Sequence, residues 1–573
     1  MDAQAATRNL TAVQLAEALL SRLKERKHEL KKIEDILGSS TAAVRNALNS
    51  SRPINRIPPE ILGLIFQHVP SRMARVDSSS QEAFMWSRAS VKATHELLEV
   101  LNVCCHWRDV ALGQPSLWTS VHVSRRIPEH SKQAYLKRAK ALPLKIYVER
   151  LPSQPVVELL RSESEWSRIQ ELHLVDFGQD DASPGGLQGY VKHPANRLQY
   201  LTLSATQTSP DEAGAAPPTQ PILFAAHAPK LHSLTLDSLY WLPGNEFQNL
   251  THICICHRRT PQEFRPAWGL PDLIALIDRC SNIQEFIFAG IEPRIDHAAL
   301  AGCVPLSADS LRRISVGKVS PGIAAWLLNH LTNPTGVGIR IFDMICGNRG
   351  LLPMLARAAP IHHPVKIGMS MEHDTLRFDA VSETGGVRVE SKVNETGRMC
   401  DDCTGWIASW WTIWSMNTIK QVWFRSPFDM RMYADHARLL GMLLSLDTMF
   451  IGECVGFAVE DSLRPWFQIL LTHQLNMSTV PCPALTTLHV WLGKSSINPD
   501  IITTFVATRA QLGLPIKRLL VECHEQSPFD KSFDWAVTHP HVDAVEFLVS
   551  RTTPGMGLLD SCVTEPHEYW PAW

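Results

Sequence analysis

A short apolar phrase that recurs along the chain constrains its fold more than any other feature. Each copy has apolar side chains at the first, fourth and sixth positions of a hexapeptide. The alternation at the end of the phrase is typical of a β-strand, and the first apolar residue anchors the turn that leads into it. The copies are Ile169, Leu172 and Leu174; Leu198, Leu201 and Leu203; Leu231, Leu234 and Leu236; Leu250, Ile253 and Ile255; Ile283, Phe286 and Phe288; Leu311, Ile314 and Val316; Ile419, Val422 and Phe424; Leu446, Met449 and Ile451; Leu485, Leu488 and Val490; Ile516, Leu519 and Val521; and Val542, Val545 and Phe547.

Helix-forming apolar runs lie between the phrases, for example at residues 273–277 and 323–328. Alternating strands and helices predict a mixed α/β fold, and the pattern resembles a leucine-rich repeat array, in which such units stack into a solenoid. The spacing is irregular and the asparagine or cysteine that usually follows the strand is mostly missing. We therefore expect a degenerate leucine-rich-repeat-like solenoid over residues 123–573. A plain α/β domain of unrelated strands is the alternative.

One segment interrupts the repeat series. Apolar residues alternate from Leu376 to Val389 on either side of Gly385-Gly386, which predicts a β-hairpin insertion near residues 374–393. Projection of this hairpin from the solenoid is one possible arrangement.

The stretch from residue 54 to residue 118 carries a second pattern. Pro58 and Pro59 followed by Glu60 predict a helix start, because proline supplies a helical φ and an acidic residue favours the positive end of the helix dipole. Apolar residues then recur at three- and four-residue steps, and we expect this helix to end at Pro70. A second, continuous helix is expected over residues 97–112.

These residues, taken in order, resemble an F-box, which we place at residues 51–122. The family pattern opens with a Pro-Pro-Glu helix start and closes with a Val-Cys-x-x-Trp-Arg run and a Pro-x-Leu-Trp end. A polar insertion at residues 71–94 departs from the compact family pattern, although a solvated loop between packed helices costs little free energy. Together with the irregular repeats, the chain resembles fungal F-box proteins. The matching residues are Ile57, Pro58, Pro59, Glu60, Ile61, Leu62, Ile65, Phe66, Val103, Cys104, Trp107, Arg108, Ala111, Pro115, Leu117 and Trp118.

Residues 1–50 form an expected N-terminal amphipathic region. Leucines and isoleucines between Leu15 and Leu37 recur near a seven-residue rhythm, which predicts a helix over residues 11–37. Gly38-Ser39-Ser40 is expected to break it, and residues 41–48 form a short second helix. One interpretation is a coiled coil that oligomerises the chain. The other, which we favour, is a helix that folds back onto the F-box or projects into solvent.

The sequence contains none of the usual catalytic or phosphate-binding motifs, so we expect no catalytic residue, no cofactor and no metal ion. Cys400 and Cys403 form a CxxC pair without the further ligands that zinc needs. Cys254 and Cys256 lie on an expected strand, and we expect their thiols to face opposite sides of it. Tryptophans at four-residue steps, from Trp406 to Trp414, favour a buried core stripe over an aromatic recognition surface.

Whole-chain composition argues against two classes of partner. A net charge of −2 lacks the basic footprint that nucleic-acid binding needs, and no run approaches the roughly 20 apolar residues of a membrane helix. The N-terminus lacks the pattern of a secretory signal. The 13 scattered cysteines are typical of reduced thiols, which predicts a cytoplasmic or nuclear protein.

The F-box resemblance also implies a function. It implies that the F-box docks on a Skp-type linker protein attached to a cullin ubiquitin ligase, while the solenoid holds an unknown target protein; the chain is then a non-catalytic adaptor. The alternative is a scaffold or binding solenoid whose F-box is a structural cap or binds a linker without cullin. The partner-binding residues implied by the resemblance are Ile57, Pro58, Pro59, Glu60, Ile61, Leu62, Ile65, Phe66, Val103, Cys104, Trp107, Arg108, Leu117 and Trp118.

Overall fold

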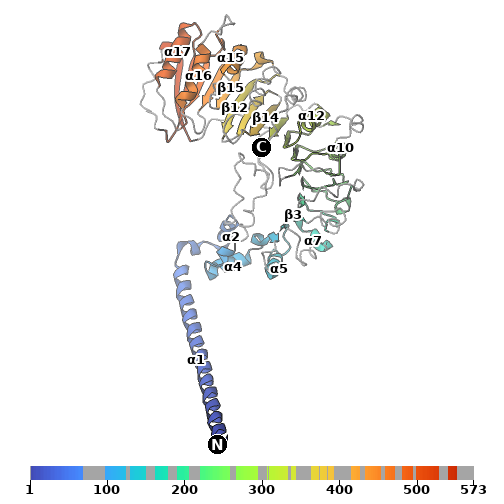
Figure 1. Cartoon of the computed structure of the whole chain (residues 1–573), viewed down its shortest axis with the longest axis vertical. Helices are drawn as coiled ribbons and strands as arrows, with labels where there is room; N and C mark the ends of the chain where they lie inside the picture. Colours follow the sequence, from blue (N-terminus) through green and yellow to red (C-terminus); the bar gives the residue numbers. More distant parts are fainter. Residues whose placement is uncertain are drawn as a thin grey trace. The chain divides into compact units, whose positions relative to one another are not determined.

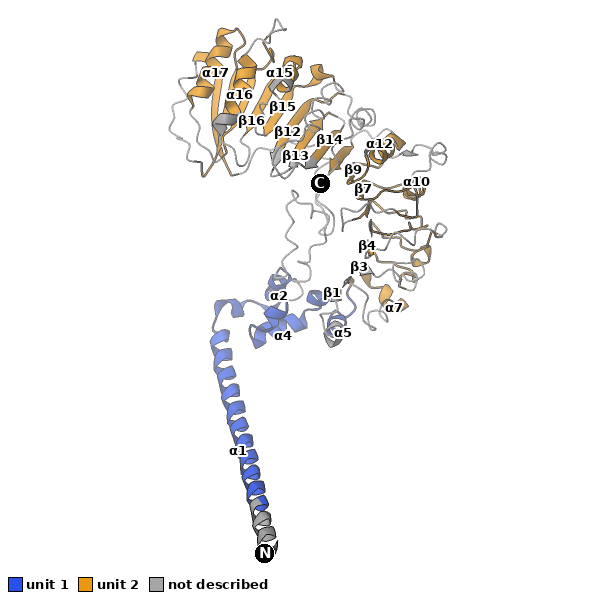
Figure 2. Cartoon of the chain, in the orientation of Figure 1, with its two compact units in different colours: residues 1–74, 87–121, 133–142 blue, residues 75–86, 122–132, 143–573 orange. Residues whose placement is uncertain are grey.

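The chain separates into two compact units, shown in Figure 2. Unit 1 holds residues 1–74, 87–121 and 133–142, and unit 2 holds residues 75–86, 122–132 and 143–573. The structure is a computed structural model. It describes residues 2–68, 97–123, 129–149, 160, 162–177, 190–205, 220–257, 266–294, 306–307, 309–332, 337–342, 363–372, 375–383, 385–392, 415–425, 433–452, 459–471, 480–493, 499–527, 538, 540–551 and 556.

Unit 1 begins with one uninterrupted helix, α1 (Asp2–Ser50), so the break expected at Gly38-Ser39-Ser40 is wrong. A glycine in a helix interior costs only about 1 kcal/mol relative to alanine, and good helix formers precede it at Leu37 and resume at Ala42 and Ala43. The Ser39 hydroxyl donates a hydrogen bond to the Asp35 carbonyl one turn earlier, at 2.7 Å. This bond satisfies the hydroxyl within the helix, so the serine does not terminate it.

The rest of unit 1 is built from short helices. Helix α2 begins at Pro59 with Glu60 in its first turn, which confirms the predicted start. The second expected helix is not continuous, because residues 97–101 are helical but Cys104 has an extended backbone and its Sγ caps the next helix. The elements are η1 (Pro53–Arg56), α2 (Pro59–Gln67), α4 (Cys105–Gly113), η3 (Pro115–Trp118) and α5 (Glu129–Arg138), of which residues 133–138 belong to unit 1.

Unit 2 is organised around a long, open, mostly parallel sheet (Figure 1). The sheet has 17 strands when β1, which crosses the boundary between the units, is counted, and a separate two-stranded sheet accompanies it. The chain therefore has the expected mixed α/β fold, with a helical region before the sheet. The strands of the large sheet are β1 (Ser120–Val123), β2 (Leu144–Glu149), β3 (Ile169–Phe177), β4 (Tyr200–Ala205), β5 (Ser233–Asp237), β6 (His252–Cys256), β7 (Glu285–Ala289), β9 (Arg313–Gly317), β11 (Gly338–Phe342), β12 (Lys366–Glu372), β13 (Thr375–Val381), β14 (Gly386–Lys392), β15 (Gln421–Arg425), β16 (Thr448–Gly452), β17 (Thr487–Trp491), β18 (Arg518–His524) and β19 (Ala544–Ser550); β8 (Leu306–Ser307) and β10 (Leu331–Thr332) form the small one.

The apolar phrases align across this sheet in one register. Leu201 pairs with Leu234, and Leu203 pairs with Leu236, as the corresponding positions do in neighbouring strands. The same alignment runs from Val422 in β15 to Val545 in β19. All of these strand residues except Val545 and Phe547 at the end of the sheet are buried, and so is the leading residue of every phrase. We call this side of the sheet the ladder face.

A three-stranded meander sits inside the sheet rather than projecting from it. Strands β13 and β14 form the expected antiparallel hairpin, and β12 pairs with the other edge of β13. Strand β14 is parallel to β11, and β12 is parallel to β15, so the meander joins the strands before and after it without changing their direction. Buried Phe378 and Ala380 of β13 continue the ladder through the meander.

Helices pack on the ladder face. The ring of Phe424 in β15 stacks on Trp466 of α16 with centroids 4.0 Å apart, and Phe467 of α16 stacks on Phe505 of α17 at 4.3 Å. Burial of these rings attaches the helical layer to the sheet. The helical segments of unit 2 are α7 (Glu163–Trp166), η5 (Phe224–Ala226), α10 (Leu270–Asp278), α12 (Pro321–His330), η6 (Met416–Thr418), α15 (Tyr433–Met442), α16 (Val459–Leu471) and α17 (Asp500–Gln511).

Candidate docking surfaces

An exposed apolar strip lies along α2 in unit 1. Ile61, Leu64 and Ile65 are 47, 51 and 40 % exposed, and their three- and four-residue spacing places them on one face of the helix. Leu62 and Phe66 of the same helix are fully buried. Because α2 is apolar both toward the core and toward solvent, its outer face is suited to contact with another protein. We call Ile61, Leu64 and Ile65 the α2 surface.

The implied partner-binding residues divide into core and surface positions. Leu62, Phe66, Leu117 and Trp118 are buried in unit 1 and support the surface from behind. The indole N–H of Trp118 donates to the carbonyl of Ala111 at 2.9 Å. The exposed members of the set are Pro58, Pro59, Glu60, Ile61, Ile65, Val103 and Arg108.

Three half-buried members, Ile57, Cys104 and Trp107, lie between core and surface. The Trp107 indole N–H donates to Asn55 Oδ1 at 2.6 Å, and its ring lies 5.1 Å from that of Phe66. Cys104 Sγ accepts the backbone N–H of Trp107 at 3.5 Å and so caps α4. The Phe66–Trp107 contact packs α2 against α4, the bond to Asn55 ties α4 to η1, and the Cys104 cap stabilises the start of α4.

A second candidate surface is the sheet side opposite the ladder face, which carries polar residues in rows. Arg340 of β11 donates from Nη2 to Glu390 Oε2 of β14 at 2.7 Å, and Arg377 of β13 donates to Glu390 Oε1 at 3.2 Å. Burial alone would raise the pKa of Glu390, but the positive charges of Arg340, Arg377 and Arg388 outweigh it and hold that pKa below its usual value. Glu390 is therefore a buried carboxylate that the neighbouring guanidinium groups keep ionised.

An aromatic group follows on the same side in strands β15 to β17. The rings of Trp423 and Phe450 stack with centroids 4.3 Å apart, and His489 meets Phe450 edge-on at 4.8 Å. His489 Nε2 lies 2.9 Å from Glu522 Oε2 of β18. Burial lowers the pKa of His489 despite that carboxylate, which favours the neutral ring. The buried Trp423 indole N–H makes no hydrogen bond to the described residues.

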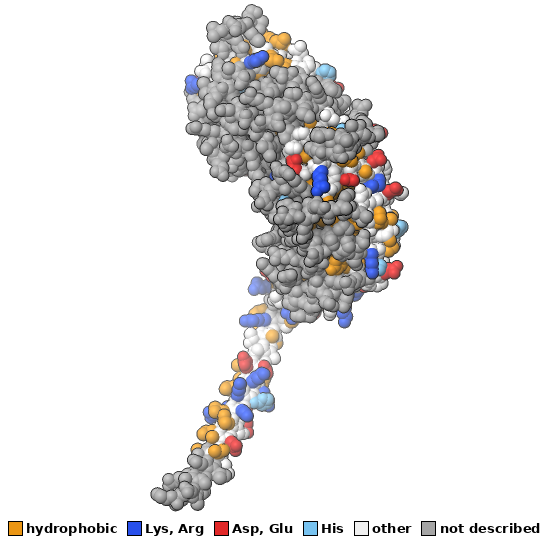
Figure 3. Space-filling view, turned by 45° about the vertical axis from the view of Figure 1, so that its right-hand side comes forward, with side chains coloured by type: hydrophobic (Ala, Val, Ile, Leu, Met, Phe, Trp, Pro, Cys, Tyr) orange, Lys and Arg blue, Asp and Glu red, His pale blue; other side chains and the backbone are white. Residues whose placement is uncertain are grey.

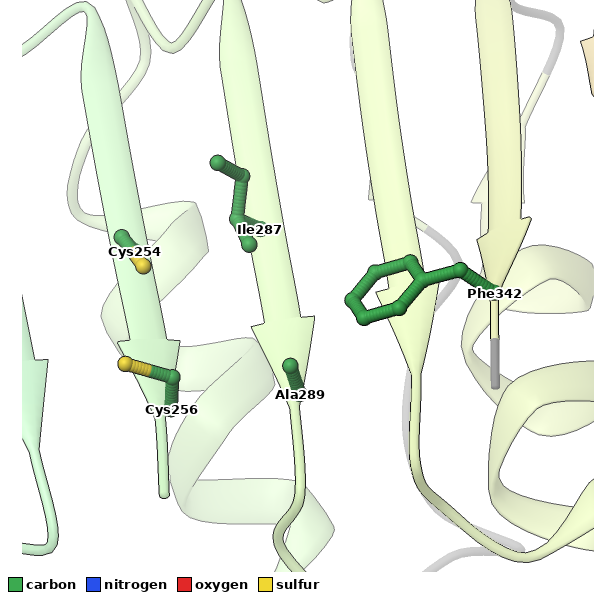
Figure 4. Close-up of a cluster of buried hydrophobic side chains, with 5 residues drawn as sticks. All are labelled: Cys254, Cys256, Ile287, Ala289 and Phe342. Carbon is green, nitrogen blue, oxygen red and sulfur yellow. The ribbon is translucent and has the colours of Figure 1, made fainter. Parts of the chain in front are cut away.

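Cys254 and Cys256 lie on one face of β6, and the expectation that their thiols point in opposite directions is wrong. Residues two apart on a strand share a face. Both side chains are buried in a small apolar cluster with Ile287, Ala289 and Phe342 (Figure 4). Among the described residues, no three His, Cys, Asp or Glu side chains gather closely enough to hold a metal ion.

Several predicted features fall outside the described residues. They are the insertion at residues 71–94, the CxxC pair Cys400 and Cys403, and the tryptophans from Trp406 to Trp414. Within the parts of the chain that the structure describes, no helix is both long and apolar enough to cross a membrane. A scan against protein-family models finds no match for the chain, and a search of the curated proteins finds none either.

Proposed function

We propose that the chain is a non-catalytic substrate-recognition adaptor of a Skp–cullin–F-box ubiquitin ligase. The observation that carries this proposal is the α2 surface, because it presents three exposed apolar side chains within the segment whose residues resemble an F-box. The buried residues of that segment, Leu62, Phe66 and Trp118, form the core on which the surface rests. Because these side chains are already about half-buried, burying the remainder against a linker supplies about half of the roughly 1.5 to 3 kcal/mol that full burial of such a side chain contributes.

The proposal assigns the sheet of unit 2 to target binding. Its in-register phrases favour a degenerate leucine-rich-repeat-like solenoid, whose units stack on their neighbours and leave one sheet side for recognition. On that side the half-buried rings of Trp423 and His489, which pack on buried Phe450, are the proposed aromatic contacts. Tethering a target there raises the effective concentration of its lysines near the transferred ubiquitin. In this role the protein works in the cytoplasm or nucleus and needs no cofactor.

The test is linker binding by surface and core variants of the full chain. The double variant Ile61→Asp/Ile65→Asp should weaken binding to a purified Skp-type linker at least about hundredfold, because two buried apolar contacts become charged. Its thermal melt should match that of the wild type, since both side chains are exposed. Leu112→Asp provides the matched control, because Leu112 is also an exposed apolar residue of unit 1 but lies on α4. Calorimetric titration of each variant with the linker measures the difference.

Two outcomes would contradict the adaptor role. Equal affinity in the double variant and the wild type would remove the α2 surface from docking. Failure of the wild type to bind any Skp-type linker would leave the segment as a structural cap. A complex with the linker that does not recruit a cullin would instead favour the scaffold alternative.

A further inference from the structure

Helix α1 exposes apolar side chains along its length. Every residue from 13 to 48 is exposed, and the helix carries large apolar side chains from Val13 to Leu48 (Figure 3). An isolated helix in water gains little stability from its own hydrogen bonds. In proteins, most of the stability of a helix comes from packing its apolar face against other parts of the structure. Pairing with another helix would cover the apolar side chains that α1 exposes.

A seven-residue repeat defines the face to be covered. The seven positions of a coiled-coil repeat are labelled a to g, and positions a and d face the partner helix. Leu23, Leu30, Leu37 and Val44 follow one another at seven-residue steps and are assigned to position a. The intervening d positions, three residues after each a position, carry apolar residues interrupted by Arg26 and Ser40. The d residues are Leu19, Arg26, Ile33, Ser40 and Ala47.

The charges of α1 oppose a parallel, in-register pair of identical helices. That arrangement would place Arg26 directly against Arg26 of the second copy. In a parallel pair, each residue at position g faces the residue at position e that comes five positions later in the second copy. Arg22 would therefore meet Lys27 of the second copy, and Glu29 would meet Glu34. Both pairs are like-charged and each occurs twice in the dimer. The two helices would therefore repel each other between residues 22 and 34 in a parallel arrangement.

An antiparallel pair with Leu30 opposite Ile33 of the second copy removes these conflicts. In that register Arg26 faces Leu37, and its long stem can lie along the seam while the guanidinium reaches water. Lys27 faces Glu34 on both sides of the dimer, an attractive pair made twice. The overlap runs from residue 13 to residue 50, so it covers all the exposed large apolar side chains between Val13 and Leu48.

From this complementarity we infer that α1 pairs with α1 of a second copy of the chain as an antiparallel two-stranded coiled coil. The dimer joins two complete chains through their N-terminal helices. It uses none of the residues of the α2 surface, so it is independent of the proposed adaptor role.

Sedimentation velocity of the full-length protein tests the inference. Lys27→Glu should weaken dimerisation by about tenfold or more, because it converts two attractive pairs with Glu34 into repulsive ones. The double variant Lys27→Glu/Glu34→Lys should restore the wild-type dissociation constant, since it reverses both charges of each pair. Lys24→Glu is the matched control; it makes the same charge change on the outer face of the helix and should have no effect.

The variants separate the geometries. In a parallel dimer Lys27→Glu would face Arg22 and tighten association, which would overturn the antiparallel arrangement. An equal dissociation constant for Lys27→Glu and Lys24→Glu would overturn the register. A wild-type chain that remains monomeric throughout the micromolar range, or that associates only with a different coiled-coil protein, would overturn self-pairing itself.

Discussion

At the scale of the residue, two buried charges of unit 2, those of Arg509 and Glu390, are held by polar partners. Arg509 of α17 is fully buried, and its guanidinium donates to the carbonyls of Pro481, Cys482 and Leu514 at 3.0 to 3.3 Å. Burial raises the pKa of the Cys482 thiol to about 12, so this cysteine stays protonated beside the arginine. Glu390 represents the other solution, in which two arginines hold a buried carboxylate ionised.

The Glu390 cluster predicts an acid-sensitive contribution to stability. Its folded pKa lies below the unfolded value of about 4.3, so the contribution is present above that pH and is lost as pH falls toward the folded pKa. Glu390→Gln should lower the free energy of unfolding by about 3 kcal/mol at pH 7, because it removes the buried carboxylate that pairs with Arg340 and Arg377. Urea unfolding at pH 7, 4 and 3 measures both effects. The variant should lose less stability than the wild type between pH 4 and 3; equal losses would remove Glu390 from the acid response.

At the scale of the element, α1 shows that one unfavourable residue does not end a helix. Gly38 lies inside it, and a Cβ built there would meet no atom within 4 Å. In the heptad assignment it also occupies the outer face, one residue after Leu37. The helix therefore tolerates the glycine at a conformational cost and gains no contact from it.

Gly38→Ala should stabilise α1 by about 1 kcal/mol, because alanine restricts the unfolded backbone and clashes with nothing in the helix. The thermal melt of the far-ultraviolet circular dichroism should shift upward, and dimerisation should be preserved or tightened. Gly322→Ala is the control, since a Cβ there is equally unhindered but lies in the first turn of α12. A lower melting temperature for Gly38→Ala would contradict the conclusion that Gly38 is only a conformational cost to α1.

At the scale of the whole molecule, the meander holds the two halves of the sheet together. Among the described strands, pairing runs from β11 through β14, β13 and β12 to β15. Each strand of such a sheet is stabilised mainly by its two neighbours, so the loss of one strand removes the cooperativity between the strands on either side of it. The central link is β13, whose Phe378 is 1 % exposed.

Phe378→Ala should destabilise the sheet by about 3 to 5 kcal/mol through the cavity that it leaves. Because β13 is the link, the two halves should then unfold separately. Hydrogen exchange followed by mass spectrometry should show protection lost first in β12 to β14. Val549→Ala, at an exposed position of β19, is the control and should leave exchange in the meander unchanged. Uniform loss of protection over all strands would contradict a linking role for β13.

The sequence by itself determined the strands of the apolar phrase, the mixed α/β fold and the start of α2, because each depends on local periodicity or on the backbone preference of proline. It also marked the hairpin of β13 and β14 through alternation around paired glycines. Tertiary structure decided that the hairpin joins the sheet. The pairing of β14 with β11, which lies far away in the sequence, produces no local sequence pattern from which it could be predicted. Tertiary structure likewise decided which members of the F-box-like pattern are surface and which are core. Ile61 and Leu62 are adjacent and equally apolar, and only the packing of α2 against its neighbours exposes one and buries the other.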